Sequence, residues 1–332
     1  CFVKQKAADG CRLSLVGSEM GIRDRTSTTD TATLSEKGGT ILVIGKNGQL
    51  AQALERHGPA RIRLVGRPEL DFDQPATLDE ALAAVNPVAV VNAAAWTAVD
   101  LAESEPEAAA RANRDGPQHL ARLCAARGIP FIHISTDYVF NGEKGGPYVE
   151  TDPICPRTVY GRTKAEGEQA VMAANPSSII LRTSWVYSAG GKNFVRTMLQ
   201  AGARNATLRV VGDQKGNPTS ADDLARAILS ILATLEHTSW KDTYSGVFHA
   251  CGTGETTWHG LAEHTLREAA RYGQPMPEII SIATTDWPTP APRPTDSRMN
   301  TDKPRQAFGI IMPRWEDSVS DVVRKTCSQQ QA

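Results

Sequence analysis

Short apolar runs recur along the chain, and the stretches between them are long enough to hold a helix. The first run, Ile41-Leu42-Val43-Ile44, is preceded and followed by glycine, and similar runs lie at 62–65, 88–91, 131–134 and 179–181. Continuous apolar runs of this length are typical of parallel strands that are buried on both faces. Their alternation with crossover segments predicts an α/β fold with a doubly wound parallel sheet of the Rossmann type.

The expected domains follow from where this alternation begins and weakens. A long helix is predicted over 106–127, which is rich in Ala and Leu and stops at Gly128 before Pro130. After about Arg182 the alternation fades, and Pro and Gly cluster at 213–219 and 287–294. We therefore expect a Rossmann domain over 40–184. A smaller α/β lobe, mainly substrate-binding, is expected over 185–326, with some segments returning to the first domain.

Residues 1–39 mix Ser, Thr, Gly and charges without a helical or alternating period. They are predicted to be an extension that is disordered or does not conform to the fold.

Composition narrows the classes of partner. The 332 residues are 40% apolar and 22% charged, which is ordinary for a globular protein, and the formal net charge is −1. Without a long basic run there is no electrostatic reason to expect nucleic acid or an anionic membrane as a partner. The sequence has no apolar stretch of 18 residues and no signal-peptide pattern, so a cytoplasmic location is expected.

The thiols and imidazoles do not follow metal-binding patterns. The six cysteines form no close pairs and are expected to be reduced. His57, His133 and His259 do not stand at ligand spacing to another His or Cys, so no metal is predicted and these histidines receive no role.

A glycine-containing turn directly follows the first predicted strand. Gly45 permits the tight turn, and Gly48 lets the backbone approach a pyrophosphate at the start of the next helix. The third position of the usual glycine pattern is Ala51, whose methyl group close packing accepts. Such turns also serve only to end strands, but the strand before and the helix after favour a dinucleotide site.

The end of the second strand bears on the choice of nicotinamide cofactor. Arg67 stands there and is suited to pair with a 2′-phosphate, which favours NADPH. Glu69 and Asp71 lie close enough to weaken this preference, so NADH stays open, as does the alternative that Arg67 is a solvated surface residue.

Tyr160 and Lys164 are four residues apart in a segment rich in helix formers, and Pro156 suits the turn before this helix or its first position. On a helix both side chains would share one face. Ketone reduction by hydride needs a proton donor, and an ammonium beside a phenol should lower the phenol pKa. Such pairs are also common on solvated helix faces. Here the pair follows a strand end that carries Thr136, whose hydroxyl is placed to bond a substrate carbonyl beside Tyr160.

Together these residues resemble the extended short-chain dehydrogenase/reductase family, and more narrowly its dTDP-4-dehydrorhamnose reductase branch. The resemblance runs from Thr40 to about Trp315. It rests on the strings at 45–50, 91–95, 97–100, 135–140 and 182–187, and on Pro218-Thr219.

The resemblance implies roles for individual residues. Thr136, Tyr160 and Lys164 would be catalytic, and Thr136, Asp137 and Trp185 would contact the nucleotide-sugar. Without the family, Trp185 is better read as core packing. The implied reaction is NADPH-dependent reduction of dTDP-4-dehydro-L-rhamnose to dTDP-L-rhamnose, which serves polysaccharide biosynthesis. With the turn and strand-end residues included, the predicted cofactor-binding residues are Gly45, Gly48, Gln49, Leu50, Arg67, Asp71, Phe72, Ala95, Trp96, Thr97, Tyr160 and Lys164.

Two positions depart from the pattern. Some relatives bind Mg²⁺ at a dimer interface through a glutamate where this chain has Ala53, so the resemblance does not carry over a Mg²⁺ site. A homodimer stays open. Relatives also have asparagine at the position of Asp296, and the loss of that amide donor is expected to alter substrate contacts.

Two alternatives remain. One is a nucleotide-sugar dehydratase, epimerase or other reductase on the same fold; dehydratases resemble Thr-Asp-Glu at the strand end, where this chain has Tyr138 as the third residue. The other is a non-catalytic NADP-binding regulatory subunit resembling that of methionine adenosyltransferase, which the presence of both Tyr160 and Lys164 argues against.

Overall fold

The computed structural model describes residues 34–330, with side chains to residue 328. Residues 1–33 of the predicted extension lie outside the described residues. The remainder of that segment contacts the folded chain, because Leu34 packs on the core and the Ser35 amide donates to Glu236 Oε2 at 3.1 Å.

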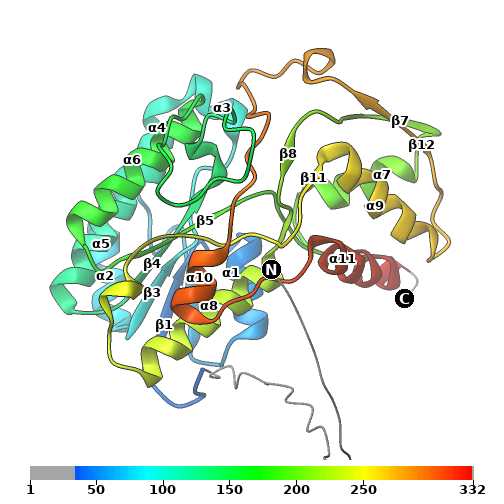
Figure 1. The fold of residues 1–332 in the computed structure, drawn as a ribbon. Coiled ribbons are helices and arrows are strands. Elements are labelled where there is room, and N and C mark those ends of the chain that lie inside the picture. Colours follow the sequence, from blue (N-terminus) through cyan, green and yellow to red (C-terminus); the bar gives the residue numbers. More distant parts are fainter. Residues whose placement is uncertain (1–33, 331–332) are drawn as a thin grey trace, which may run out of the picture. The chain divides into compact units, whose positions relative to one another are not determined.

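A six-stranded parallel sheet forms the centre of the fold (Figure 1). The strand order is β10-β5-β4-β3-β1-β2, so β1 lies between β2 and β3 and the chain reverses its direction of travel across the sheet there. The predicted doubly wound sheet is confirmed. The strands are β1 (Ile41–Ile44), β2 (Ile62–Val65), β3 (Ala89–Asn92), β4 (Phe131–Thr136), β5 (Ile179–Thr183) and β10 (Gly246–His249).

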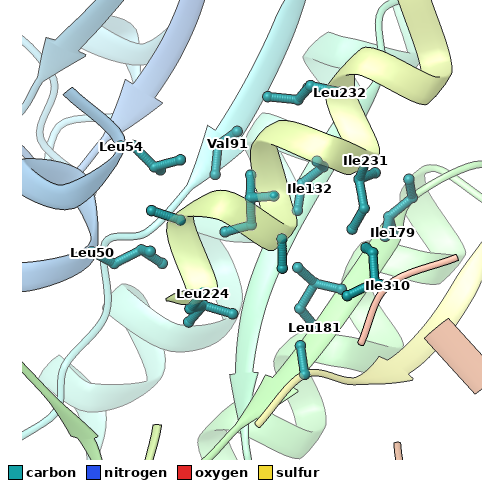
Figure 2. Close-up of a cluster of buried hydrophobic side chains, with 14 of the residues drawn as sticks. Leu50, Leu54, Val91, Ile132, Ile179, Leu181, Leu224, Ile231, Leu232 and Ile310 are labelled. Carbon is teal, nitrogen blue, oxygen red and sulfur yellow. The ribbon is translucent and has the colours of Figure 1, made fainter. Parts of the chain in front are cut away.

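Alternate residues of the strands enter two separate apolar layers. Ile41 and Val43 face the layer under α1 (Gln49–His57) and α8 (Ala221–His237), whereas Leu42 and Ile44 face the other. Figure 2 shows the first layer, with Leu224, Ile231 and Leu232 of α8 packed against the strands. The second layer is covered by α2 (Ala76–Val85), α5 (Gly116–Arg127) and α6 (Val159–Ala174).

The helical stretch predicted over 106–127 is present, with one irregular turn. It comprises α4 (Pro106–Ala110), a π-helical turn (Arg111–Asp115) and α5, and it ends where Gly128 adopts a left-handed φ of 65°. The π turn brings Asn113 to the loop after β3, where its Oδ1 accepts from the Trp96 amide at 2.8 Å. The short helix α3 (Val99–Ser104) precedes this stretch.

Beyond β5 the chain builds a second group of small elements and also returns to the sheet. β10 pairs with β5, and α8 and α10 (Asp302–Phe308) pack beside the sheet. Figure 1 shows α7, α9, α11, β7 and β12 together on one side of the sheet. The elements of this lobe are β6 (Val186–Tyr187), α7 (Phe194–Gly202), β7 (Thr207–Val211), β8 (Lys215–Gly216), β9 (Thr219–Ser220), β11 (Thr256–Thr257), α9 (Trp258–Ala270), β12 (Glu278–Ile282) and α11 (Trp315–Gln330).

Within 34–330 no helix has both the length and the apolar character needed to cross a membrane.

Candidate active site

One cavity of about 870 Å³ lies at the carboxyl ends of the sheet strands. It lies at the ends of β1 and β3, where the chain reverses its direction of travel across the sheet, and this is the place where open α/β sheets bind ligands. Asp71 is not part of the cavity wall, although its neighbours are. The other predicted site residues all line it: Gly45, Gly48, Gln49, Leu50, Arg67, Phe72, Ala95, Trp96, Thr97, Thr136, Asp137, Tyr160, Lys164 and Trp185.

The glycine turn after β1 has the geometry that a diphosphate requires. Gly45 has a φ of 107°, and a β-carbon there would lie 2.9 Å from the Ala94 nitrogen. Gly48 is the N-cap of α1 and has no side chain, which leaves the first amides of the helix available to an anion. The residues therefore fit the phosphates of a dinucleotide.

Arg67 is not a free cation at the ribose end of this cavity. Its Nε donates to Asp71 Oδ1 at 3.0 Å, and its Nη2 lies 3.2 Å from Asp73 Oδ2. Asp73 also binds Arg111 Nε at 2.6 Å. A 2′-phosphate would have to compete with these two carboxylates for the arginine, whose side chain is 67% exposed.

Tyr160 and Lys164 lie one turn apart on α6, as their spacing predicted, and both are buried. The helix begins at Val159, so Pro156 lies in the preceding turn and not at the first helical position. Thr158 caps the helix by accepting from the Gly161 amide at 2.9 Å. Gly161 is required by close approach, since a β-carbon there would lie 2.2 Å from the Tyr138 carbonyl oxygen.

Burial dominates the ionisation of both side chains. It raises the pKa of Tyr160 to about 12, while a hydrogen bond with Thr136 acts in the opposite direction. It lowers the pKa of Lys164 to about 8, and the nearby Glu168 carboxylate opposes this shift. The net lowering of the Tyr160 pKa that the sequence predicted is therefore wrong for this arrangement. The Lys164 Nζ instead donates to the Ile134 carbonyl at 2.6 Å.

Asp137 is a buried carboxyl group beside the tyrosine. Its Oδ1 accepts from the Thr136 hydroxyl at 3.0 Å. Burial raises the pKa of Asp137 to about 6, with hydrogen bonds from Ser297 and Thr136 acting against this shift. The group therefore changes its charge only slightly below neutral pH.

Trp185 lines the cavity and is also packed against other side chains. It adopts a left-handed φ of 47° and stacks on Trp258. Gly216 also lies against the indole, since a β-carbon there would be 2.6 Å from it. Trp258 and Lys192 also line the cavity and were missed by the sequence analysis. The Gly190-Gly191 pair before Lys192 is a loop signal that could have drawn attention to it.

Asp296, which stands where relatives have asparagine, is bound by a neighbouring arginine. Arg298 binds Asp296 through Nε at 2.8 Å and Nη2 at 2.7 Å, and its Nη1 reaches Glu255 at 2.7 Å. The carboxylate is thus neutralised by a neighbouring arginine.

Comparison with known proteins identifies the family. The model of the family described as RmlD substrate binding domain matches residues 39–328. The chain belongs to this family. An RmlD-family relative from Sinorhizobium fredii, a dTDP-4-dehydrorhamnose reductase, is 44% identical over 285 residues, which are 85% of this chain and 96% of the relative. The resemblance to the dTDP-4-dehydrorhamnose reductase branch is confirmed.

Solved structures agree with this assignment. The dTDP-4-dehydrorhamnose reductase of Clostridium acetobutylicum is 32% identical with a TM-score of 0.79, and the alignment covers 88% of this chain and all of that one. The Bacillus anthracis reductase, solved in complex with NADP, is 28% identical with a TM-score of 0.80, and its alignment covers 87% of this chain and all of that one.

Proposed function

We propose that the chain is an NADPH-dependent reductase that converts dTDP-4-dehydro-L-rhamnose into dTDP-L-rhamnose, with Tyr160 as the proton donor. One observation carries this proposal: Tyr160 and Lys164 line the same cavity as the glycine turn after β1. The family relatives named as this reductase, and the relative solved with NADP, support the substrate and the cofactor.

When bound, NADPH supplies the hydride. The protein's part is to hold and deliver a proton at the forming alkoxide. A phenol with a pKa of about 12 stays protonated at neutral pH, so Tyr160 holds the proton until the carbonyl oxygen becomes basic. Thr136 bonds to Tyr160 and would orient the carbonyl oxygen of the substrate. The Lys164 ammonium would stabilise the phenolate after transfer, and Asp137 and Trp185 would hold the sugar.

The turn Gly45–Leu50 and the small residues 93–95 would hold the cofactor diphosphate, and Trp96 and Thr97 the adjoining part of the dinucleotide. Phe72 and Arg67 line the other end of the cavity and would hold the adenosine and its 2′-phosphate. Among the described residues no group of three or more His, Cys, Asp or Glu side chains is arranged to hold a metal ion, and no step is assigned to one. Because activated sugars and NADPH are cytoplasmic metabolites, we place the reaction in the cytoplasm.

The test is an absorbance assay of NADPH consumption with dTDP-4-dehydro-L-rhamnose. Tyr160→Phe should lose about 10²- to 10⁴-fold in kcat, the usual worth of a positioned acid, with a much smaller change in the Kd for NADPH. Phe at 160 preserves the ring contact with Tyr138, so folding should be unaffected. A chain that binds NADPH tightly and oxidises it with no keto-sugar would instead be a non-catalytic subunit.

A further inference from the structure

Three buried side chains form a line from β3 through β4 to Lys164 on α6. Asn92 and His133 face each other in register on neighbouring strands, and Asn92 Nδ2 lies 3.0 Å from His133 Nδ1. His133 Nε2 lies 3.4 Å from Lys164 Nζ. Asn92 and His133 have no exposed surface, and of the three only Lys164 lines the cavity.

The orientation of the Asn92 amide is fixed by the backbone. Its Oδ1 accepts from the Ala94 amide at 3.1 Å, and the reversed orientation would place two donors against each other. The Asn92 NH₂ group must therefore face the imidazole. It donates to His133 Nδ1, which has to be an acceptor.

This contact determines the tautomer of His133. Burial lowers the pKa of His133 well below its usual value, and the neighbouring Lys164 lowers it further, so the ring is neutral. A neutral imidazole carries one proton, and with Nδ1 as acceptor that proton sits on Nε2. The Nε2–H group therefore points at Lys164 Nζ.

An ammonium group has only donors to offer this N–H. The neutral amine of Lys164 can accept from His133 Nε2, but the charged form cannot, although the Ile134 carbonyl accepts from either. The charged form is favoured by Glu168 on α6, whose carboxylate is already engaged by Arg182 of β5 at 2.9 and 2.7 Å. On the cavity side the titratable groups are Tyr160 and Asp137.

We propose that Asn92 and His133 are positioning residues for Lys164. By presenting an N–H to Lys164, they offer its ammonium no acceptor at His133 on β4. The charged form is therefore directed to the acceptors of the cavity. They thereby also set the pH at which the lysine loses its charge. The kinetic consequence rests on the proposed reductase function, whereas the tautomer and the lysine titration do not.

The experiment compares two variants with the native chain. Asn92→Asp replaces the donor with an acceptor, which moves the histidine proton to Nδ1 and leaves Nε2 free to accept from the ammonium. His133→Phe keeps a ring of similar size beside Phe131 and removes the N–H. His119→Asn is the control, because His119 lies on α5 and pairs with Asp79 of α2 at the surface.

Three readouts are used on the full chain: ¹⁵N spectra of the histidine rings, the pH titration of lysine ¹³Cε signals, and the pH profile of kcat/KM. We expect the native His133 proton on Nε2. In Asn92→Asp the lysine titration and the basic limb of the profile should move up by about one pH unit, because the ammonium gains an acceptor and a negative charge nearby. His133→Phe should move both in the same direction, and His119→Asn should move neither.

A native His133 proton on Nδ1 would overturn the proposal, and so would folded variants in which the Lys164 titration does not move. If His133→Phe does not fold, the native tautomer and Asn92→Asp still decide. If no keto-sugar is reduced, the proposed function fails while the two NMR readouts still test the positioning pair.

Discussion

Trp185 and Trp258 lie face to face, with ring centroids 3.6 Å apart and planes inclined by 9°. Trp185 follows β5, and Trp258 begins α9 in the smaller lobe, where its Nε1 donates to Gln214 at 3.1 Å. Trp185 has a left-handed backbone conformation, which is strained for a residue other than glycine and needs contacts with neighbouring side chains to hold it. The stack therefore joins the wall of the cavity to the lobe.

Trp258→Leu should raise KM for the nucleotide-sugar by about tenfold and leave the Kd for NADPH unchanged. The reason is that an aromatic stack contributes about 0.5–1.5 kcal/mol, and its loss frees Trp185 from the position in which we propose that it binds the substrate. Steady-state kinetics and a separate NADPH titration would measure the two effects. Trp240→Leu is the matched control, because Trp240 lies beyond α8 at the surface and should leave KM as it is. A fall in kcat without a change in KM would contradict this role.

Asp137→Asn should lower kcat/KM and raise the free energy of unfolding at pH 7. A carboxyl whose pKa is raised to about 6 binds a proton more tightly when folded, so the folded state loses stability as pH rises from about 4 to about 6. Asparagine avoids this cost, and we expect about 1–2 kcal/mol greater stability at pH 7. Below pH 4 the two proteins should unfold at the same denaturant concentration. A lower midpoint for the variant at pH 7 would contradict the argument.

The same change tests whether substrate binding needs the carboxylate. In the native chain kcat/KM should fall as pH drops through about 6, because Asp137 becomes neutral. Asp137→Asn should have a lower kcat/KM at pH 7 and no fall in that range. If both profiles share the same acid limb, another group is responsible.

The sheet and the placement of Tyr160 and Lys164 on one helix could be predicted because their signals are local. Apolar runs such as 41–44 identify buried strands, and a spacing of four residues places Tyr160 and Lys164 on one helix face. β10 was missed because only Val247 and Phe248 form its apolar run, and its burial comes from pairing with β5.

The remaining features depend on contacts between distant segments. Nothing near Trp258 in the sequence indicates that it will stack on Trp185. The carboxylate of Asp296, which stands where relatives have asparagine, is neutralised by Arg298, and this contact was not predicted either. The Tyr160 pKa was predicted in the wrong direction for a related reason. Charge proximity is visible in the sequence, whereas the depth of burial that outweighs it is set by packing.

Arg67→Ala should reduce affinity for NADPH by about tenfold and leave affinity for NADH unchanged. The arginine would bind only the 2′-phosphate, and its ion pairs with Asp71 and Asp73 reduce the gain from that contact. Fluorescence titrations with both cofactors would measure the difference. Arg63→Ala, an exposed position on β2, the strand that precedes Arg67, should change neither affinity. An equal loss for NADH and NADPH would exclude Arg67 as the source of the preference.

Asp222→Asn should destabilise the fold by about 2 kcal/mol, because one buried carboxylate neutralises cations from two other helices. Asp222 of α8 binds Arg56 of α1 at 2.7 Å and Lys325 of α11 at 2.9 Å. These partners hold the pKa of Asp222 well below its usual value although burial opposes them. The stabilisation is therefore complete above the unfolded pKa of about 3.9 and declines as pH falls below it. Urea unfolding should show a large difference in unfolding free energy from the native chain at pH 7 and a smaller one at pH 3.

The control is Asp321→Asn, which breaks an exposed pair with Arg324 and should cost less than about 0.5 kcal/mol at either pH. Equal costs for the two variants at pH 7 would mean that the Asp222 cluster does not hold the three helices together.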